Sequence, residues 1–179
     1  MELIQDKQKK AFAALKGEFG WKNPMQVPRV EKIIISVGVG RAAKEKGRLE
    51  FISDRLGKIT GQKPAVRGAK KSIATYKTRI GDPVGYQVTL RGTRARDFLN
   101  RLLHIALPRT KDFKGIGTAS IDEMGNYTLG IKEHTVFPET ADEDIKDVFG
   151  MAITVVTTAK NKKEATAYFT QLGFPFKKA

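Results

Sequence analysis

The chain has 179 residues, contains no cysteine and carries a net charge of +14 at pH 7, which excludes disulfide bonds, thiol catalysis and thiolate metal sites. An apolar fraction of 40% is sufficient for a folded core, and the large positive charge indicates a nucleic acid or another acidic surface as partner. No segment has the pattern of a signal peptide or the roughly 20 apolar residues of a membrane span, so we expect a soluble protein of the cytoplasm.

The first third of the chain predicts a helix, a strand and a second helix. Residues 3–20 place apolar side chains on one face and lysines on the other, which is typical of an amphipathic helix. The β-branched run within residues 29–39 predicts a buried strand. Apolar residues at helical spacing over 44–60 predict the second helix, with Gly61 as its C-cap.

A basic loop followed by a strand is predicted from Gln62 to Arg91. This segment holds seven Lys or Arg residues and one acid, Asp82. Strict alternation at its end is typical of a half-buried strand. The core face of this strand would consist of Val84, Tyr86, Val88 and Leu90, and its polar face of Gly85, Gln87, Thr89 and Arg91.

The second half of the chain predicts further helices and strands. Thr93 is expected to cap a helix over residues 94–107, which ends before Pro108. Residues 109–120 are rich in glycine and basic residues and predict a loop. The sequence of residues 127–131 predicts a strand that follows a turn.

Two capping boxes are predicted closer to the C-terminal end of the sequence. Thr140 and Glu143 match the pattern at the start of a short helix, and Asn161 and Glu164 match it at the start of a longer one. Between them, residues 151–158 predict a strand because they are apolar and rich in β-branched side chains.

Together these elements favour an α+β fold. The connections are too short or too rich in loops for a regular doubly wound sheet. We therefore expect a largely antiparallel sheet with helices packed on one face, as in ferredoxin-like folds and RNA-recognition modules, with a free concave face and projecting loops. Residues 1–179 are interpreted as a single domain, with helix 3–20 as an appendage.

The residues indicate no enzymatic or cofactor site. The segment 38–43 is similar to the dinucleotide-binding pattern G-x-G-x-x-A, but that pattern needs an acid about 20 residues later. The sequence has the basic segment 63–67 there, so a tight turn is the favoured interpretation. His104 and His134 belong to no catalytic or metal-binding motif.

A metal site in the acidic segment is also disfavoured. The spacing of its carboxylates does not match an EF-hand, and acids in the first turn of a helix complement the helix dipole. The acids concerned are Asp142, Glu143, Asp144 and Asp147. We therefore expect no catalytic residue, no metal, no cofactor and no small-molecule substrate.

The distribution of charge predicts two different surfaces. Residues 62–114 contain 13 basic and 3 acidic side chains, whereas residues 115–150 contain 2 and 8. Tyr76 and Tyr86 lie among the basic residues, where they can stack on bases. This combination favours nucleic-acid binding over a merely solvated face, and RNA over DNA because no DNA-binding motif is present. Structured RNA is favoured over single strands because the aromatic RNP motif of RNA-recognition modules is missing.

Four blocks of the sequence resemble a known family. They are PRVEKIIISVGVGRA, ITGQKPAVRGAKKSIATYKTRIGDPVGYQVTLRG, KDFKGIGTASIDEMGNYTLGIKEHTVFPE and GMAITVVTTAKNKKEATAYFTQLGFPF. In order and spacing they are similar to the bacterial form of the large-subunit ribosomal protein five family, which binds 5S rRNA. The resemblance implies an α+β fold and a place in the ribosome, in the central protuberance of the large subunit with other 5S-associated proteins.

The resemblance also implies which side chains hold the 5S rRNA. They lie on the concave face of the sheet and in flanking loops, and in this chain they correspond to Ser36, Gln62, Lys63, Lys70, Lys71, Thr89 and Arg91. Two positions depart from the family pattern. Ser36 stands where asparagine is usual, and Arg67 stands where a small hydroxyl residue is common.

Two further contacts are implied by the same resemblance. The family's loop that reaches P-site tRNA corresponds to Tyr76, Lys77, Thr78, Arg79, Ile80, Gly81 and Asp82. The parts that meet small-subunit ribosomal protein thirteen, a basic protein, correspond to Arg109, Lys111, Asp112, Phe113, Lys114, Asp142, Glu143 and Asp144.

Two alternatives from other functional classes stay open. One is an RNA-modifying or processing enzyme with a basic docking face. The other is a protein-interaction module whose main site is the acidic segment, residues 115–150. The preferred interpretation is a structural ribosomal protein that attaches to RNA by charge and shape.

Overall fold

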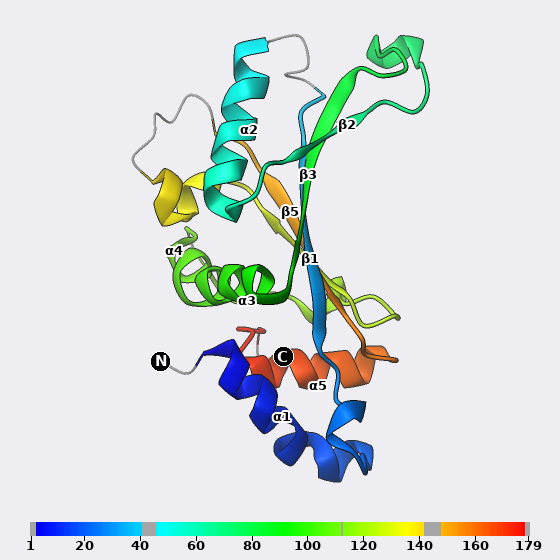
Figure 1. Ribbon diagram of the computed structural model, residues 1–179, viewed down its shortest axis with the longest axis vertical. Coiled ribbons are helices and arrows are strands. Elements are labelled where there is room, and N and C mark those ends of the chain that lie inside the picture. Colours follow the sequence, from blue (N-terminus) through cyan, green and yellow to red (C-terminus); the bar gives the residue numbers. More distant parts are fainter. Residues whose placement is uncertain (1–2, 41–45, 112, 142–147, 178–179) are drawn as a thin grey trace. The chain divides into compact units, whose positions relative to one another are not determined.

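The computed structural model describes residues 3–40, 46–111, 113–141 and 148–177 (Figure 1). Contacts divide the chain into two compact units. Unit 1 contains Met1–Ile33, Leu90–Leu129 and Thr154–Ala179, and unit 2 contains Ile34–Thr89 and Gly130–Ile153. Within the described ranges, no helix is long and apolar enough to cross a membrane.

One open antiparallel sheet holds the strands of the described chain, in the order β2-β3-β1-β5-β4. The strands are β1 (Val30–Gly38), β2 (Ala65–Gly68), β3 (Pro83–Arg91), β4 (Tyr127–Ile131) and β5 (Met151–Thr157). The order β5-β1-β3-β2 is the split βαβ arrangement of ferredoxin-like folds, with β4 added beyond β5. The predicted α+β class is confirmed.

Helix α1 (Ile4–Phe19) packs against α5 (Lys162–Leu172) and α3 (Gly92–Arg101) within unit 1. Its backbone N–H at Ile4 donates to Asn100 Oδ1 over 3.0 Å. The Lys7 ammonium donates to the carbonyl of Leu172 over 3.0 Å, where a cation complements the C-terminal end of the α5 dipole. These contacts make α1 part of the core of unit 1.

The start and the end of α3 differ from the prediction. Thr93 is not its cap, because the helix begins at Gly92, two residues before the predicted start, with a φ of +59° at Gly92. Pro108 does not follow the helix but lies within α4 (Leu107–Arg109), after a π turn over Leu102–Ala106. A proline has no N–H and its ring crowds the carbonyl four residues back, and a wider turn is a common way to accommodate a break in the hydrogen-bond ladder.

Helix α5 begins after Asn161 as predicted, but its capping box is wrong in detail. The Asn161 side chain makes no capping bond, and Glu164 Oε2 accepts from the backbone N–H of Lys160 over 2.8 Å. The other predicted box falls on Thr140 and Glu143. The short helix expected there lies outside the described residues, and the Thr140 hydroxyl donates to the carbonyl of His134 over 3.0 Å.

An aromatic cluster closes the core of unit 1 around Tyr127. Its ring centroid lies 5.7 Å from those of Phe169 and Phe174, and 6.0 Å from that of Phe176. Burial raises the pKa of Tyr127 to about 12, because an ionised phenolate loses hydration there. Tyr168, also buried, has its pKa raised to about 12 for the same reason.

Helix α2 (Lys46–Thr60) supplies the core of unit 2 and packs against η6 (Pro138–Thr140). The backbone N–H of Gly61 donates to the carbonyl of Gly57 over 2.8 Å, and its φ of +67° confirms the predicted C-cap. His134 is fully buried and stacks on Phe149 with 4.1 Å between ring centroids. It is therefore a packed core residue.

Gly85 on β3 allows close approach of the neighbouring strand β1. A Cβ at this position would lie 2.9 Å from the carbonyl oxygen of Val37. A Cβ added to Gly130 on β4 would have no neighbouring heavy atom within 4 Å.

We expect the substitution Gly85→Ala to lower the free energy of unfolding by about 1–3 kcal/mol, because backbone must move to admit the methyl group. Urea denaturation of the two variants measures this difference. Gly130→Ala is the matched strand control and should leave the unfolding midpoint nearly unchanged. Equal effects of the two substitutions would contradict the close approach.

We expect stability to fall as the pH rises through the range of about 10 to 12. The folded-state pKa of each buried tyrosine is raised, so folding favours the protonated phenol; this contribution is complete below the unfolded pKa of 10.0 and is lost as the pH approaches the folded value of about 12. Thermal unfolding against pH, for wild type and Tyr127→Phe, measures it. A Tyr127→Phe profile as steep as that of wild type would contradict the assignment.

Candidate RNA interface

Strands β2 and β3 pair as a two-stranded ribbon, and most of the predicted RNA-binding residues lie on this ribbon or in the segments that flank β2. Ala65 pairs with Gln87 and Arg67 with Gly85, and the register shifts after Arg67. Figure 1 shows that this ribbon ends in the loop that holds the short helix η2 (Ala74–Tyr76). Every residue of β2 is exposed.

The segment before β3 was predicted as a loop, and this prediction was wrong for β2. The strand is only four residues long, Ala-Val-Arg-Gly, and shows no burial alternation. Its extended form comes from pairing with β3, which the sequence of β2 alone does not specify. The burial predicted for β3 is confirmed for Tyr86, Val88 and Leu90. It is wrong at the start of the strand, where Val84 is only half-buried and Gly85, predicted on the polar face, is buried.

The cations of this region are available to an outside partner. Their side chains are exposed, and in the described part of the chain none of them forms an ion pair with an acid; they are Lys63, Arg67, Lys70, Lys71, Lys77 and Arg79. Asp82, the one acid of the segment, accepts from the backbone N–H of Arg79 over 2.7 Å. A row of unpaired cations is the electrostatic pattern expected of a phosphate-binding surface.

Gln62 and Thr89 are brought together by the turn after α2. The Gln62 Nε2 donates to the carbonyl of Thr89 over 3.4 Å, and the Thr60 hydroxyl donates to the carbonyl of Gln62 over 3.0 Å. Ser36 is exposed on β1, the strand next to β3 in the sheet. In unit 2, Ser36 of β1 is therefore exposed, and Thr89 of β3 is half-buried.

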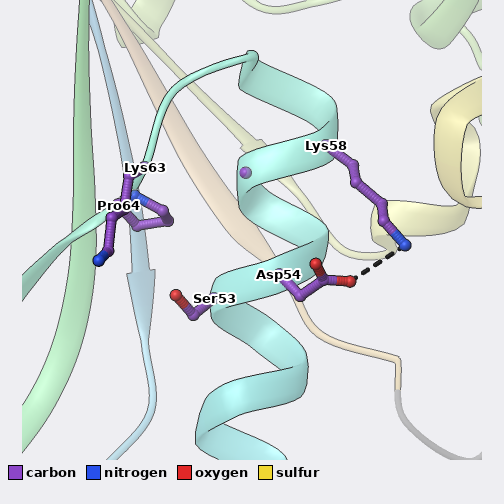
Figure 2. Close-up of a pocket in the computed structure, with 6 residues that line it drawn as sticks. Ser53, Asp54, Lys58, Lys63 and Pro64 are labelled. Atoms are coloured by element: carbon purple, nitrogen blue, oxygen red, sulfur yellow. Dashed lines mark ion pairs between the residues drawn. The ribbon is translucent and has the colours of Figure 1, made fainter.

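Lys63 lines an open groove of about 360 Å³ with residues of α2. The other lining residues are Ser53, Asp54, Gly57, Lys58 and Pro64. Asp54 and Lys58 form an ion pair of 3.1 Å. Figure 2 shows Lys63 on the opposite side of the groove from this pair, so that its ammonium is not neutralised by Asp54.

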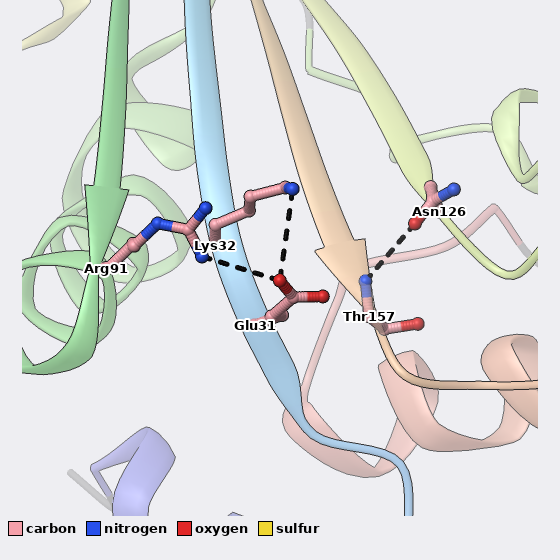
Figure 3. A network of polar contacts seen from close by, with 5 residues as sticks. All are labelled: Glu31, Lys32, Arg91, Asn126 and Thr157. Carbon is pink, nitrogen blue, oxygen red and sulfur yellow. Dashed lines mark hydrogen bonds and ion pairs between the residues drawn. The ribbon is translucent and has the colours of Figure 1, made fainter.

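Arg91 has a different environment from the other predicted rRNA residues. It belongs to unit 1, whereas the other six belong to unit 2. Arg91 Nη1 lies 3.4 Å from Glu31 Oε1, and Lys32 Nζ lies 3.9 Å from the same oxygen (Figure 3). Glu31 therefore neutralises part of the positive charge of Arg91 and Lys32, which the sequence prediction did not include.

The loop predicted to reach tRNA is held by its own hydrogen bonds. Ile73 and Thr78 exchange backbone bonds of 3.1 and 3.3 Å, and Ala69 accepts from Gly81 over 3.0 Å. Lys77 has a φ of +52°, in the left-handed region, at the turn after η2. These bonds give the loop a defined form without support from a core.

Two large side chains project from this loop into solvent. Tyr76 is 74% exposed and Ile80 is 73% exposed. Tyr86, by contrast, is buried, so the predicted stacking role is possible only for Tyr76. Exposed aromatic and aliphatic surface beside Lys77 and Arg79 is typical of a recognition loop.

The residues predicted to meet a small-subunit protein are only partly described. Arg109, Lys111 and Lys114 are exposed, and Phe113 is half-buried. The remaining four, Asp112, Asp142, Glu143 and Asp144, lie outside the described residues.

Comparison with known proteins assigns the family. The family model described as "Ribosomal protein L5" matches residues 23–79, and the model for the C-terminus of the same family matches residues 83–176. The chain belongs to the ribosomal protein L5 family. This result confirms the resemblance found in the sequence and a structural rather than an enzymatic class.

Curated relatives from the same family are similar to this chain over nearly their full length. "Large ribosomal subunit protein uL5" of Dictyoglomus turgidum is 48% identical over 179 residues, covering 99% of this chain and 100% of the relative. The protein of the same name from Rubrobacter xylanophilus is 47% identical over 178 residues, covering 99% of each chain.

One pair of residues in this region was not predicted from the sequence. Arg67 Nε donates to Gln87 Oε1 over 2.7 Å, across the ribbon. Both lie within the basic segment from Gln62 to Arg91, but 20 positions separate them, and only the β2–β3 register brings them together.

We expect Asp82→Ala to loosen the loop of residues 76–82 while leaving the fold intact, because the backbone N–H of Arg79 loses its carboxylate partner. Amide hydrogen exchange at Arg79 should become faster, and the global unfolding midpoint should hardly change. Glu123→Ala, which removes an exposed acid of unit 1, is the control and should leave exchange at Arg79 unaltered. Unchanged exchange in Asp82→Ala would contradict this role.

Proposed function

We propose that the protein is a structural constituent of the large ribosomal subunit that binds 5S rRNA in the central protuberance. The observation that carries this proposal is the set of exposed, unpaired cations on β2 and in the segments that flank it, within the described residues of an L5-family chain. Phosphate contacts supply most of the affinity for RNA, and polar side chains fix its register.

In this proposal the rRNA contacts are made by Ser36, Gln62, Lys63, Lys70, Lys71, Thr89 and Arg91. Lys63, Lys70 and Lys71 provide unpaired charge, while Gln62 presents a side-chain amide held by its hydrogen bond to the backbone carbonyl of Thr89. Arg91 contributes less than the lysines, because RNA competes there with Glu31.

Two further partners belong to the same proposal. The loop Tyr76, Lys77, Thr78, Arg79, Ile80, Gly81 and Asp82 contacts P-site tRNA, supported by its exposed Tyr76 and Ile80 and by its internal bonds. Small-subunit ribosomal protein thirteen is met by the segments that contain Arg109–Lys114 and Asp142–Asp144, and other 5S-associated proteins lie beside the protein. The exposure of Arg109, Lys111 and Lys114 is compatible with such a contact.

The experiment is the affinity of the full chain for bacterial 5S rRNA over a series of salt concentrations. We expect replacement of Lys63, Lys70, Lys71 and Arg91 by alanine to weaken binding and to reduce the slope of log affinity against log salt by about three to four units. The loss follows from the counterions that these cations no longer release.

The control removes four exposed lysines of unit 1, Lys22, Lys160, Lys162 and Lys163. This variant has the same net charge as the test variant, and its specific affinity should stay within about twofold of wild type. Equal losses in the two variants would mean that total charge, and not this surface, determines binding. Cleavage or modification of the RNA by the wild-type chain would favour an enzyme instead.

A further inference from the structure

We propose that Arg67 and Gln87 form a phosphate-binding site on the β2–β3 ribbon, in addition to the seven rRNA residues named above. The ligand class is a phosphodiester of the RNA backbone. This inference rests on the proposed function, because it adds a contact to the same RNA. In it, Arg67 touches the phosphate and Gln87 is a positioning residue.

The ribbon register leaves a path for the Arg67 side chain. Gly85 lies directly opposite Arg67 and has no side chain, and Ala65, opposite Gln87, is small. Arg67 can therefore reach diagonally across the strand pair, a distance that long side chains span readily. The contact that results, Arg67 Nε to Gln87 Oε1, measures 2.7 Å.

This contact leaves the phosphate-binding end of the guanidinium unoccupied. An arginine has five N–H donors, and Nε supplies only one of them. In the described residues, the Arg67 side chain makes no other hydrogen bond and no ion pair. The two terminal amino groups are thus free for the two-pronged contact that arginine makes with phosphate.

Gln87 reduces the cost of ordering the arginine. An exposed arginine loses several rotatable bonds when it binds, and this loss weakens the contact. The bond to Gln87 restricts those rotations before RNA arrives. The register shift directly after Arg67 is a bulge-like irregularity, a feature that commonly re-aims a strand side chain.

The electrostatic surroundings favour an anion at this point. Residues 62–71 contain four basic side chains and no acid. Lys63, Arg67 and Lys70 are exposed and form no ion pair within the described chain. No described carboxylate therefore competes with a phosphate for Arg67. An RNA phosphate that docks on the lysines therefore meets an arginine whose donors are already oriented.

The test measures the affinity of full-length variants for bacterial 5S rRNA across salt concentrations. Arg67→Ala should weaken binding about threefold to tenfold and reduce the salt slope by about one unit. Gln87→Ala should weaken binding to a smaller extent and retain most of the slope, because the charge remains. Arg67→Lys should recover the slope but not the affinity, since lysine lacks the Nε donor.

A double-variant cycle isolates the positioning role. In the Arg67→Ala background, Gln87→Ala should cause no further loss of affinity. An additional loss there would overturn the role of Gln87. Lys163→Ala, which removes one exposed charge from α5, is the control for total charge and should bind as wild type.

The outcomes separate this inference from the proposed function. If alanine at Lys63, Lys70 and Lys71 weakens binding but Arg67→Ala and Gln87→Ala do not, the Arg67 site is wrong and the proposed function stands. If the two variants lower only the thermal-unfolding midpoint, the contact is structural and the inference is overturned. If wild type shows no preference for 5S rRNA over an unrelated RNA of equal length, the proposed function itself fails.

Discussion

The backbone pairing of β2 with β3 is the interaction on which the candidate RNA surface depends. β2 has four exposed residues and no core contacts of its own, so only its ladder with β3 defines its position. β3 is held by Tyr86, Val88 and Leu90, which are buried. The position of Arg67 on β2 therefore depends on the burial of the apolar face of β3.

The ribbon concentrates charge that the folded protein does not neutralise. Residues 62–114 carry 13 basic and 3 acidic side chains, and the cations of residues 63–79 have no acidic partner within the described chain. Such a surface repels itself and gains stability from a polyanion. RNA binding and the stability of the fold are thereby linked. Bound RNA would reduce the repulsion between these cations, which otherwise lowers the stability of unit 2.

Elements with strong periodicity were predictable, and features that depend on tertiary register were not. The burial alternation from Tyr86 to Leu90 and the cap at Gly61 follow from local residue types and were correct, whereas the burial of Gly85 depends on the close approach of β1. β2 is too short for a periodic signal, and the start of α3 depended on the φ of Gly92 rather than on the hydroxyl of Thr93. The candidate site shows the same division. Its cations are visible in the sequence, whereas the contacts of Arg67 with Gln87 and of Arg91 with Glu31 depend on how the strands pair.

The carboxylate of Glu31 gives Arg91 a counterion that is built into the chain. It lies 3.4 Å from Arg91 and 3.9 Å from Lys32, so two cations share one acid. A phosphate that binds the lysines of the ribbon releases mobile salt ions, and the entropy of those ions drives binding. A phosphate that binds Arg91 displaces a tethered group, which gains little freedom when it leaves. In the proposed interface, attachment at Arg91 would therefore be less sensitive to salt than attachment along the ribbon, and the protein would hold its RNA by two contacts of different ionic character.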